Sequence, residues 1–85
     1  MTLFHTTKAE NVDSILKTGL RTSGLGIVYL SEKPETWWQS AGMVTLAVNM
    51  DGITHRLTTF NDPKLDEILC WGDIPPEAIS VHKCH

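Results

Sequence analysis

The sequence predicts one α+β domain with an antiparallel-rich sheet. Its 85 residues, 1–85, suffice for a single domain. Residues 8–18 place apolar side chains at helical spacing, whereas most later segments are short β-branched or alternating runs. The predicted order is strand, helix, strand, helix and then several strands, without an internal repeat or linker. Such a mixed order is typical of the α+β class.

The opening residues predict the first strand and the first helix. Leu3 to Thr6 form a short run that favours a strand. Thr7 and Glu10 have the spacing of a capping box, in which the two side chains satisfy free amides at a helix start. A helix over residues 8–18 is therefore expected. Gly19 is placed to end this helix in a left-handed conformation.

A second strand and a second helix are predicted in the middle of the chain. Ile27 to Leu30 is a β-branched and aromatic run, which favours a strand. Ser31 and Pro34 predict that a helix begins next, because proline is preferred in the first helical turn. Gly42 marks its expected end. The domain is therefore expected to contain two short helices.

The remaining segments predict strands. Met43 to Met50 alternates apolar and other residues, and Asp51-Gly52 is a turn signal. Ile53 to Leu57 also alternates and is the expected hairpin partner of the preceding strand. Two further strands are predicted over Asp66 to Trp71 and Ile79 to Lys83, with a proline-rich turn between them.

Composition limits the classes of function. The formal net charge is −3 and the two arginines are Arg21 and Arg56. This balance argues against general nucleic-acid binding, because phosphate contacts need clustered lysine and arginine. The first residues lack the basic start and apolar stretch of a secretory signal, and no run approaches the roughly 18 apolar residues of a membrane span. The two cysteines, Cys70 and Cys84, are expected as free thiols. We therefore expect a cytoplasmic protein that does not bind membranes.

His5 is the first candidate functional residue. It stands at the end of the first predicted strand, directly before a helix start. A histidine there is commonly structural, but it would also lie at the edge of a cleft beside the free amide donors of a helix. The run His82 to His85 contains three potential metal ligands as well, yet one such cluster falls short of a closed zinc site. We expect no metal, and we predict that this tail is frayed.

Tyr29 and Glu67 are the other two candidates. Val28 and Leu30 should point to one face of their strand as core residues, which leaves Tyr29 on the other face. This tyrosine is either an ordinary aromatic of the sheet or a residue that faces something other than the core. Glu67 begins an apolar strand, where a glutamate is commonly solvated. Asp66 alternates to the other face and is the weaker candidate.

Three segments together resemble the His–Tyr–Glu skeleton of the ADP-ribosyltransferase fold. The resemblance implies an ADP-ribosyltransferase-like split sheet with two short helices over most of the chain. The chain is shorter than usual for this family, and it has Thr6 where the family frequently has glycine. The closing segment is the most specific of the three. The segments are Phe4-His5-Thr6-Thr7, Val28-Tyr29-Leu30-Ser31, and Glu67-Ile68-Leu69 leading into Ile74-Pro75-Pro76-Glu77-Ala78-Ile79.

The resemblance implies that the chain binds NAD and breaks its glycosidic bond. His5 would hold a ribose hydroxyl, and the backbone of Thr6 would pair with the nicotinamide amide. Glu67 would accept a hydrogen bond from the ribose 2′-hydroxyl. The same carboxylate would stabilise the positive charge that develops as nicotinamide leaves. Glu67 is therefore the expected catalytic residue.

The resemblance also implies contacts for the rest of the dinucleotide. Tyr29 would stack on the nicotinamide ring, and Trp37 or Trp38 could supply a second aromatic. Arg21 could neutralise the NAD pyrophosphate as a bidentate donor, although an exposed arginine is equally ordinary. The implied reaction is mono-ADP-ribosyl transfer to a macromolecular acceptor, either protein or nucleic acid, with release of nicotinamide.

Three other functions stay open. A domain reduced to the cleft could bind NAD, an ADP-ribose derivative or a protein partner without turnover, as a small phage or mobile-element effector or inhibitor. The tRNA 2′-phosphotransferase branch of the fold begins with a similar histidine motif but depends on several arginines, and this chain has two. The third alternative is a protein-interaction module anchored by Trp37, Trp38 and Trp71.

Overall fold

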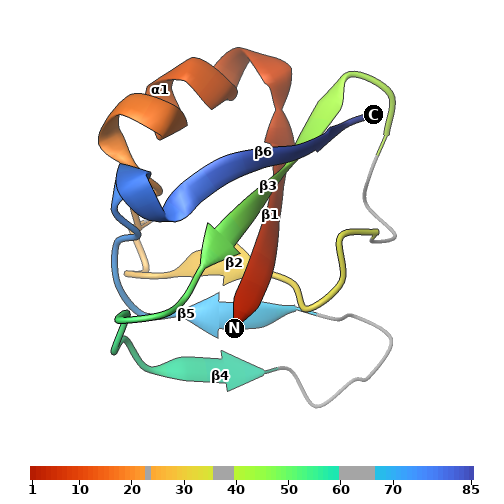
Figure 1. Ribbon diagram of the computed structural model, residues 1–85. Helices are drawn as coiled ribbons and strands as arrows, with labels where there is room; N and C mark the ends of the chain where they lie inside the picture. Colours follow the sequence, from red (N-terminus) through yellow and green to blue (C-terminus); the bar gives the residue numbers. More distant parts are fainter. Residues whose placement is uncertain (23, 36–39, 60–66) are drawn as a thin grey trace.

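A computed structural model of the chain describes residues 1–22, 24–35, 40–59 and 67–85. Within these residues, strands dominate and one short α-helix lies at one end of the molecule (Figure 1). This is an α+β arrangement. The elements in chain order are β1 (Thr2–Lys8), the 3-10 turn η1 (Ala9–Asn11), α1 (Val12–Thr18), β2 (Val28–Leu30), β3 (Met43–Asn49), β4 (Leu57–Thr59), β5 (Ile68–Cys70), the 3-10 turn η2 (Pro76–Ala78) and β6 (Ile79–Cys84).

The strands form two antiparallel sheets of three strands each. One sheet has the order β1-β3-β6 and the other has the order β2-β5-β4. The two sheets meet where Phe4 in β1 and Ser31 after β2 exchange two backbone hydrogen bonds, each of 2.8 Å. β1 and β2 are therefore neighbours, and the boundary between the two sheets runs between these strands (Figure 1).

Both sheets contribute to one hydrophobic core. Leu3 and Leu46 come from the first sheet and Leu30 from the second, and each is at most 1% exposed. Val12 and Ile15 of α1 pack against this core from one side. Burial of such side chains is the main favourable term in folding, so the shared core joins the two sheets into one unit. The buried residues of this hydrophobic core are Leu3, Leu20, Val28, Leu30, Val44, Leu46, Val48, Met50, Ile68, Cys70, Ile74 and Ile79.

The glycine end of the first helix is confirmed. Gly19 has a φ of 86°, and its N–H donates to the carbonyl of Ile15 at 2.7 Å. Leu20 and Ile74 then exchange two backbone hydrogen bonds of 2.9 and 2.8 Å. A Cβ atom on residue 19 would overlap the Ile74 carbonyl oxygen, so only glycine fits this approach.

The predicted capping box is wrong. Thr7 lies inside β1, where it pairs with Val44, and neither η1 nor α1 has a side-chain cap. The strand continues to Lys8 because β3 supplies a pairing partner for every residue from Thr2 onwards. Tertiary pairing therefore overrides the local capping signal, and the helical segment begins later than predicted.

The predicted second helix is absent from the part of its range that the structure describes. Residues 31–35 and 40–42 contain no helix, and residues 36–39 lie outside the description. Ser31 is fully buried in the bridge to Phe4, and its hydroxyl donates to the carbonyl of Lys33 at 2.8 Å. These contacts hold the start of the segment in a bend instead of a helical turn.

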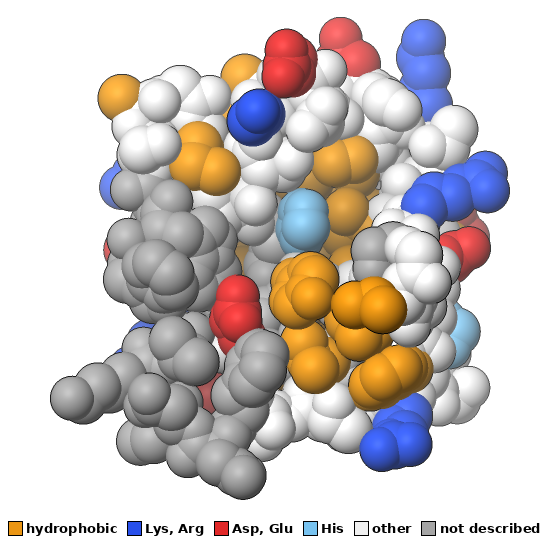
Figure 2. Space-filling view, turned by 180° about the vertical axis from the view of Figure 1, so that it is seen from behind, with side chains coloured by type: hydrophobic (Ala, Val, Ile, Leu, Met, Phe, Trp, Pro, Cys, Tyr) orange, Lys and Arg blue, Asp and Glu red, His pale blue; other side chains and the backbone are white. Residues whose placement is uncertain are grey.

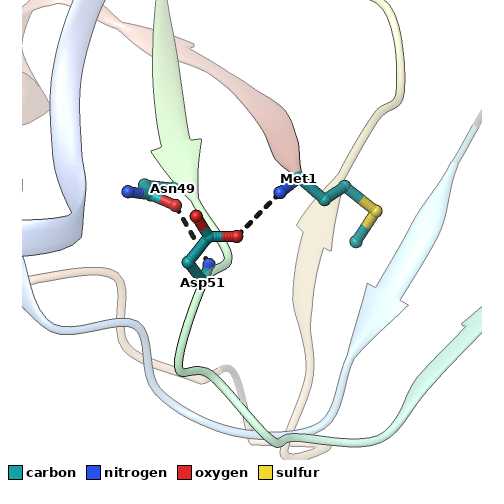
Figure 3. Close-up of polar contacts among 3 residues, drawn as sticks. All are labelled: Met1, Asn49 and Asp51. Atoms are coloured by element: carbon teal, nitrogen blue, oxygen red, sulfur yellow. Dashed lines mark hydrogen bonds and ion pairs between the residues drawn. The ribbon is translucent and has the colours of Figure 1, made fainter.

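The predicted hairpin after β3 is also wrong. β3 pairs with β1 and β6, whereas β4 pairs with β5. The Asp51-Gly52 turn forms, but it is fixed by the start of the chain. The Met1 ammonium group lies 2.9 Å from the Asp51 carboxylate, and Asn49 accepts the Asp51 N–H at 3.0 Å (Figure 3). The chain then crosses to the second sheet instead of turning back.

The predicted frayed tail is ordered. β6 runs to Cys84, and His85 continues the contact with β3. The His85 N–H donates to the carbonyl of Met43 at 2.8 Å, and its ring Nε2 lies 2.6 Å from the hydroxyl of buried Thr45. Cys70 and Cys84 are both free, as expected.

Candidate functional site

His5 and Tyr29 come from neighbouring strands and contact each other. His5 Nδ1 lies 2.7 Å from the Tyr29 carbonyl oxygen. Val28 and Leu30 are buried while Tyr29 is 43% exposed, so the predicted outward orientation of the tyrosine is confirmed. The bridge between Phe4 and Ser31 sets the spacing of the two strands at this point. The split between the sheets therefore places the His5 imidazole against the backbone of an exposed tyrosine.

The contact defines the protonation of the histidine ring. A carbonyl oxygen can only accept, so Nδ1 carries the hydrogen and the neutral ring keeps an acceptor lone pair on Nε2. Burial lowers the pKa of His5 below its ordinary value, and the bond to Tyr29 opposes this shift only in part. His5 is therefore a neutral hydrogen-bond acceptor at pH 7.

The two residues line a cleft between α1 and β2, which we call the α1–β2 cleft. Its volume is about 430 Å³, within the range of small-molecule sites. Its lining combines polar side chains from β1, η1 and α1 with apolar side chains from α1, the turn after it and β2. The described residues that line it are His5, Thr7, Asn11, Ser14, Ile15, Thr18, Gly19, Leu20, Arg21, Ile27, Val28 and Tyr29.

One face of the molecule carries a group of apolar side chains. Figure 2, seen from behind the view of Figure 1, shows hydrophobic side chains gathered next to a histidine, with a carboxylate side chain at the border of the group. Tyr29 is one of the exposed large hydrophobic residues, and Trp71 is another at 41% exposure. The Arg56 guanidinium lies 5.6 Å from the centre of the Trp71 ring, within cation–π range.

Arg21 supplies the charge of the α1–β2 cleft. It is the one charged side chain among the described lining residues, because His5 is neutral. In the described part of the chain no carboxylate forms an ion pair with Arg21. A guanidinium without a described carboxylate partner, in a cleft with hydroxyl and amide groups, suits a ligand that carries phosphate.

Glu67 directly precedes β5, and the alternation of β5, if extended by one residue, assigns it to the Tyr29 face of the second sheet. Tyr29 pairs with Leu69, and directly paired residues share a face. Glu67 precedes Leu69 by two residues, and side chains two apart point to the same face. Glu67 is half-buried. The described residues that line the α1–β2 cleft do not include it.

Of the other predicted residues, Thr6 does not line the cleft by its side chain. The hydroxyl of Thr6 lies 3.1 Å from the hydroxyl of Thr45 in β3, and Thr6 is not among the described lining residues. Its side chain belongs to the opposite face of β1 from His5. Trp38, together with Trp37 and Asp66, lies outside the described residues.

The polar part of the cleft lining was not anticipated from the sequence. Thr7, Asn11, Ser14 and Thr18 follow one another at intervals of three or four residues, although only Ser14 and Thr18 lie in α1 while Thr7 belongs to β1 and Asn11 to η1. The Asn11 amide donates to the Thr7 hydroxyl at 3.3 Å, and Thr18 donates to the Ser14 carbonyl at 2.9 Å. The signal was visible as a polar stripe, but such a stripe is also ordinary for a solvated helix.

Comparisons with known proteins identify no family for this chain. No protein-family model matches the sequence, and no curated protein matches it. Within the described residues, no three or more His, Cys, Asp and Glu side chains are grouped to hold a metal ion. The described helix is too short and too polar to cross a membrane. Inferences about function therefore depend on the α1–β2 cleft.

Proposed function

We propose that this protein is a mono-ADP-ribosyltransferase that uses NAD. One observation carries the proposal: His5, Arg21 and Tyr29, from three separate segments, line the same cleft. These are residues that the family resemblance assigns to the dinucleotide. The substrate would be NAD, the leaving group nicotinamide, and the acceptor a protein or nucleic acid.

The residues of the cleft suit different parts of the dinucleotide. His5 Nε2 would accept a hydrogen bond from a ribose hydroxyl, while Nδ1 stays fixed on the Tyr29 carbonyl. The exposed Tyr29 ring would stack on the cationic nicotinamide ring, which favours the positively charged form of the substrate. Arg21 would face the pyrophosphate.

Glu67 would act on the reaction itself. Strand alternation extended from Leu69 would direct it to the same side of the sheet as the stacked nicotinamide. When the bond between ribose C1′ and the nicotinamide nitrogen breaks, the electron pair leaves with nicotinamide and positive charge develops on the ribose. A fixed carboxylate stabilises that charge in the transition state more than in the bound substrate.

The test is nicotinamide release by the purified protein, with and without candidate acceptors. Glu67→Gln should leave NAD affinity nearly unchanged, because the amide fills the same space and still accepts a hydrogen bond. Cleavage of NAD should fall by about 10²–10³, as when one preorganised electrostatic group is removed. The matched control is Glu77→Gln, which changes an exposed carboxylate of η2 that does not line the α1–β2 cleft.

Tyr29 provides a separate test of substrate binding. Tyr29→Ala should weaken NAD binding in calorimetry by roughly 1–3 kcal/mol through lost stacking and burial. Tyr29→Phe retains the ring and should bind NAD nearly as well as the original protein. Absence of NAD and ADP-ribose binding at millimolar concentration would instead favour a protein-interaction module.

A second candidate function is a nucleotide-binding domain without turnover. The absence of Glu67 from the described lining of the α1–β2 cleft favours this alternative. Such a domain would bind NAD or ADP-ribose and would release no nicotinamide. It would also show no kinetic difference between the original protein and Glu67→Gln, so the same assay separates the two functions.

A further inference from the structure

The segment before η2 makes two polar contacts through one residue, Asp73. The Asp73 carboxylate accepts the backbone N–H of Thr22 at 2.8 Å. The Asp73 carbonyl accepts a hydrogen bond from His55 Nε2 at 2.7 Å. His55, before β4, therefore fixes the backbone of Asp73. The Asp73 side chain in turn holds Thr22, in the chain after α1.

The next residue along the same segment holds the same loop. Ile74 and Leu20 exchange backbone hydrogen bonds of 2.8 and 2.9 Å. The backbone is thus attached at Leu20 and again at Thr22, on either side of Arg21. Two attachments that flank one residue leave its backbone little freedom, so the Arg21 side chain starts from a fixed position in the wall of the α1–β2 cleft.

The close contact between Gly72 and His55 supports the view that this segment fixes the position of Asp73. A Cβ atom on residue 72 would lie 2.6 Å from the His55 ring, so the backbone passes against the imidazole. Close contact of this kind keeps the Asp73 carbonyl in reach of His55 Nε2. His55 therefore contacts both Gly72 and the Asp73 carbonyl, while the Asp73 carboxylate accepts the Thr22 N–H.

We propose that Asp73 is a positioning residue that holds Arg21 for the phosphate groups of the dinucleotide. This inference rests on the proposed function, because it assigns the ligand of Arg21. It gives the turn before η2 a role beyond linking β5 to β6. The carboxylate of Asp73 acts through the Thr22 backbone, and the Arg21 guanidinium contacts the ligand.

The sign of the effect separates positioning from simple electrostatics. Asp73 is an anion attached beside a site for anionic phosphate. If its charge were its main influence, removing it would strengthen binding of ADP-ribose. If it positions Arg21, removing the carboxylate weakens binding, because the guanidinium loses its fixed geometry. Asp73→Asn distinguishes the two effects, since the amide oxygen can still accept the Thr22 N–H.

The experiment is calorimetric titration of ADP-ribose into five proteins: the original chain, Arg21→Ala, Asp73→Ala, Asp73→Asn and the Arg21→Ala/Asp73→Ala double variant. Arg21→Ala should weaken binding about tenfold, the loss of one charge-assisted phosphate contact. Asp73→Ala should weaken it about three- to tenfold, whereas Asp73→Asn should stay within about twofold of the original. The double variant should bind no more weakly than Arg21→Ala, because Asp73 acts only through Arg21.

A second readout is the salt dependence of ADP-ribose affinity. The original protein should lose affinity as salt rises, and both Arg21→Ala and Asp73→Ala should show a flatter dependence. Glu77→Ala is the charge-matched control, since it removes a carboxylate of the same C-terminal region that does not contact Thr22. It should change neither the affinity nor its salt dependence beyond the small effect of net charge.

Three results with the Asp73 variants would overturn the inference even if the original chain binds ADP-ribose through Arg21. They are tighter binding by Asp73→Ala, equal loss in Asp73→Asn and Asp73→Ala, and additive losses in the double variant. Circular dichroism checks folding. If Asp73→Ala does not fold, Asp73→Leu replaces it, because leucine retains the volume and has no oxygen acceptor. Absence of ADP-ribose binding by the original chain would overturn the proposed function and this inference together, whereas binding that depends on Arg21 but not on Asp73 would overturn this inference alone.

Discussion

His5 acts in its neutral form, and burial keeps it neutral. Its pKa in the folded protein is lower than the ordinary value of 6.5, because desolvation disfavours the imidazolium ion. In the unfolded chain the ring takes up a proton as pH falls past 6.5, while in the folded chain it does so only at lower pH. Stability from this residue is therefore present above pH 6.5 and is lost as pH falls towards the folded pKa.

The first prediction follows from that proton linkage. The free energy of unfolding should fall between about pH 7.5 and pH 5.5, and it should fall less in His5→Asn. Asparagine has no proton to gain in this range, and its amide N–H can replace Nδ1 as donor to the Tyr29 carbonyl. Urea unfolding at the two pH values measures the difference. An identical pH dependence in both proteins would show that His5 titrates alike in the folded and unfolded chain.

At the scale of elements, the turn after α1 is the point at which the helix is tied to the sheets. Gly19→Ala places a methyl group against the Ile74 carbonyl and imposes a φ of 86° on alanine. We expect a loss of about 2–4 kcal/mol in the free energy of unfolding, since strain and steric overlap add. Gly52→Ala is the control: residue 52 has a φ of 81° with open space around it, so only the strain of about 1 kcal/mol applies. Equal losses in the two variants would mean that the Ile74 contact costs nothing.

The elements also show how far local sequence patterns reach. The predicted strands at the start, after Gly42 and at the end all form, because their alternating or β-branched residues fit a half-buried sheet. The capping box at Thr7 and the hairpin after Asp51 do not form, although both signals are sound locally. Their failure has one cause: β3 pairs with β1 and β6, and no local pattern encodes which distant strands will pair.

The same limit applied to the candidate site. Strand alternation was enough to predict that Tyr29 faces away from the core. Strand alternation could not predict that His5 contacts the Tyr29 carbonyl, because that contact depends on the bridge between β1 and the end of β2. The link from Asp73 to Thr22 spans 51 residues, and a turn aspartate gives no local sign of such a partner.

At the scale of the whole molecule, the two sheets share one core and should unfold together. Leu46 of β3 and Cys70 of β5 are both fully buried in the same cluster, although they belong to different sheets. A domain of this size has a total stability of about 5–10 kcal/mol. Because this free energy of unfolding is small and both sheets share the core, weakening one sheet should unfold the other with it.

The last prediction uses a substitution in one sheet and a probe in the other. Leu46→Ala should lower the free energy of unfolding by about 2–5 kcal/mol, the cost of a cavity in a packed core. Trp71 follows β5 and reports the second sheet, provided that Trp37 and Trp38 are replaced by phenylalanine. Tryptophan fluorescence and far-UV circular dichroism should then give the same lowered midpoint in urea.

A neighbouring position provides the control for that experiment. Val81 of β6 pairs directly with Leu46 but is 48% exposed. Val81→Ala removes methyl groups that are largely in contact with water, so it should cost less than about 1 kcal/mol. If Leu46→Ala shifted the circular dichroism transition and left the Trp71 transition in place, the sheets would be separate folding units. The α1–β2 cleft would then lie between two independently moving halves, because His5 and Tyr29 come from different sheets.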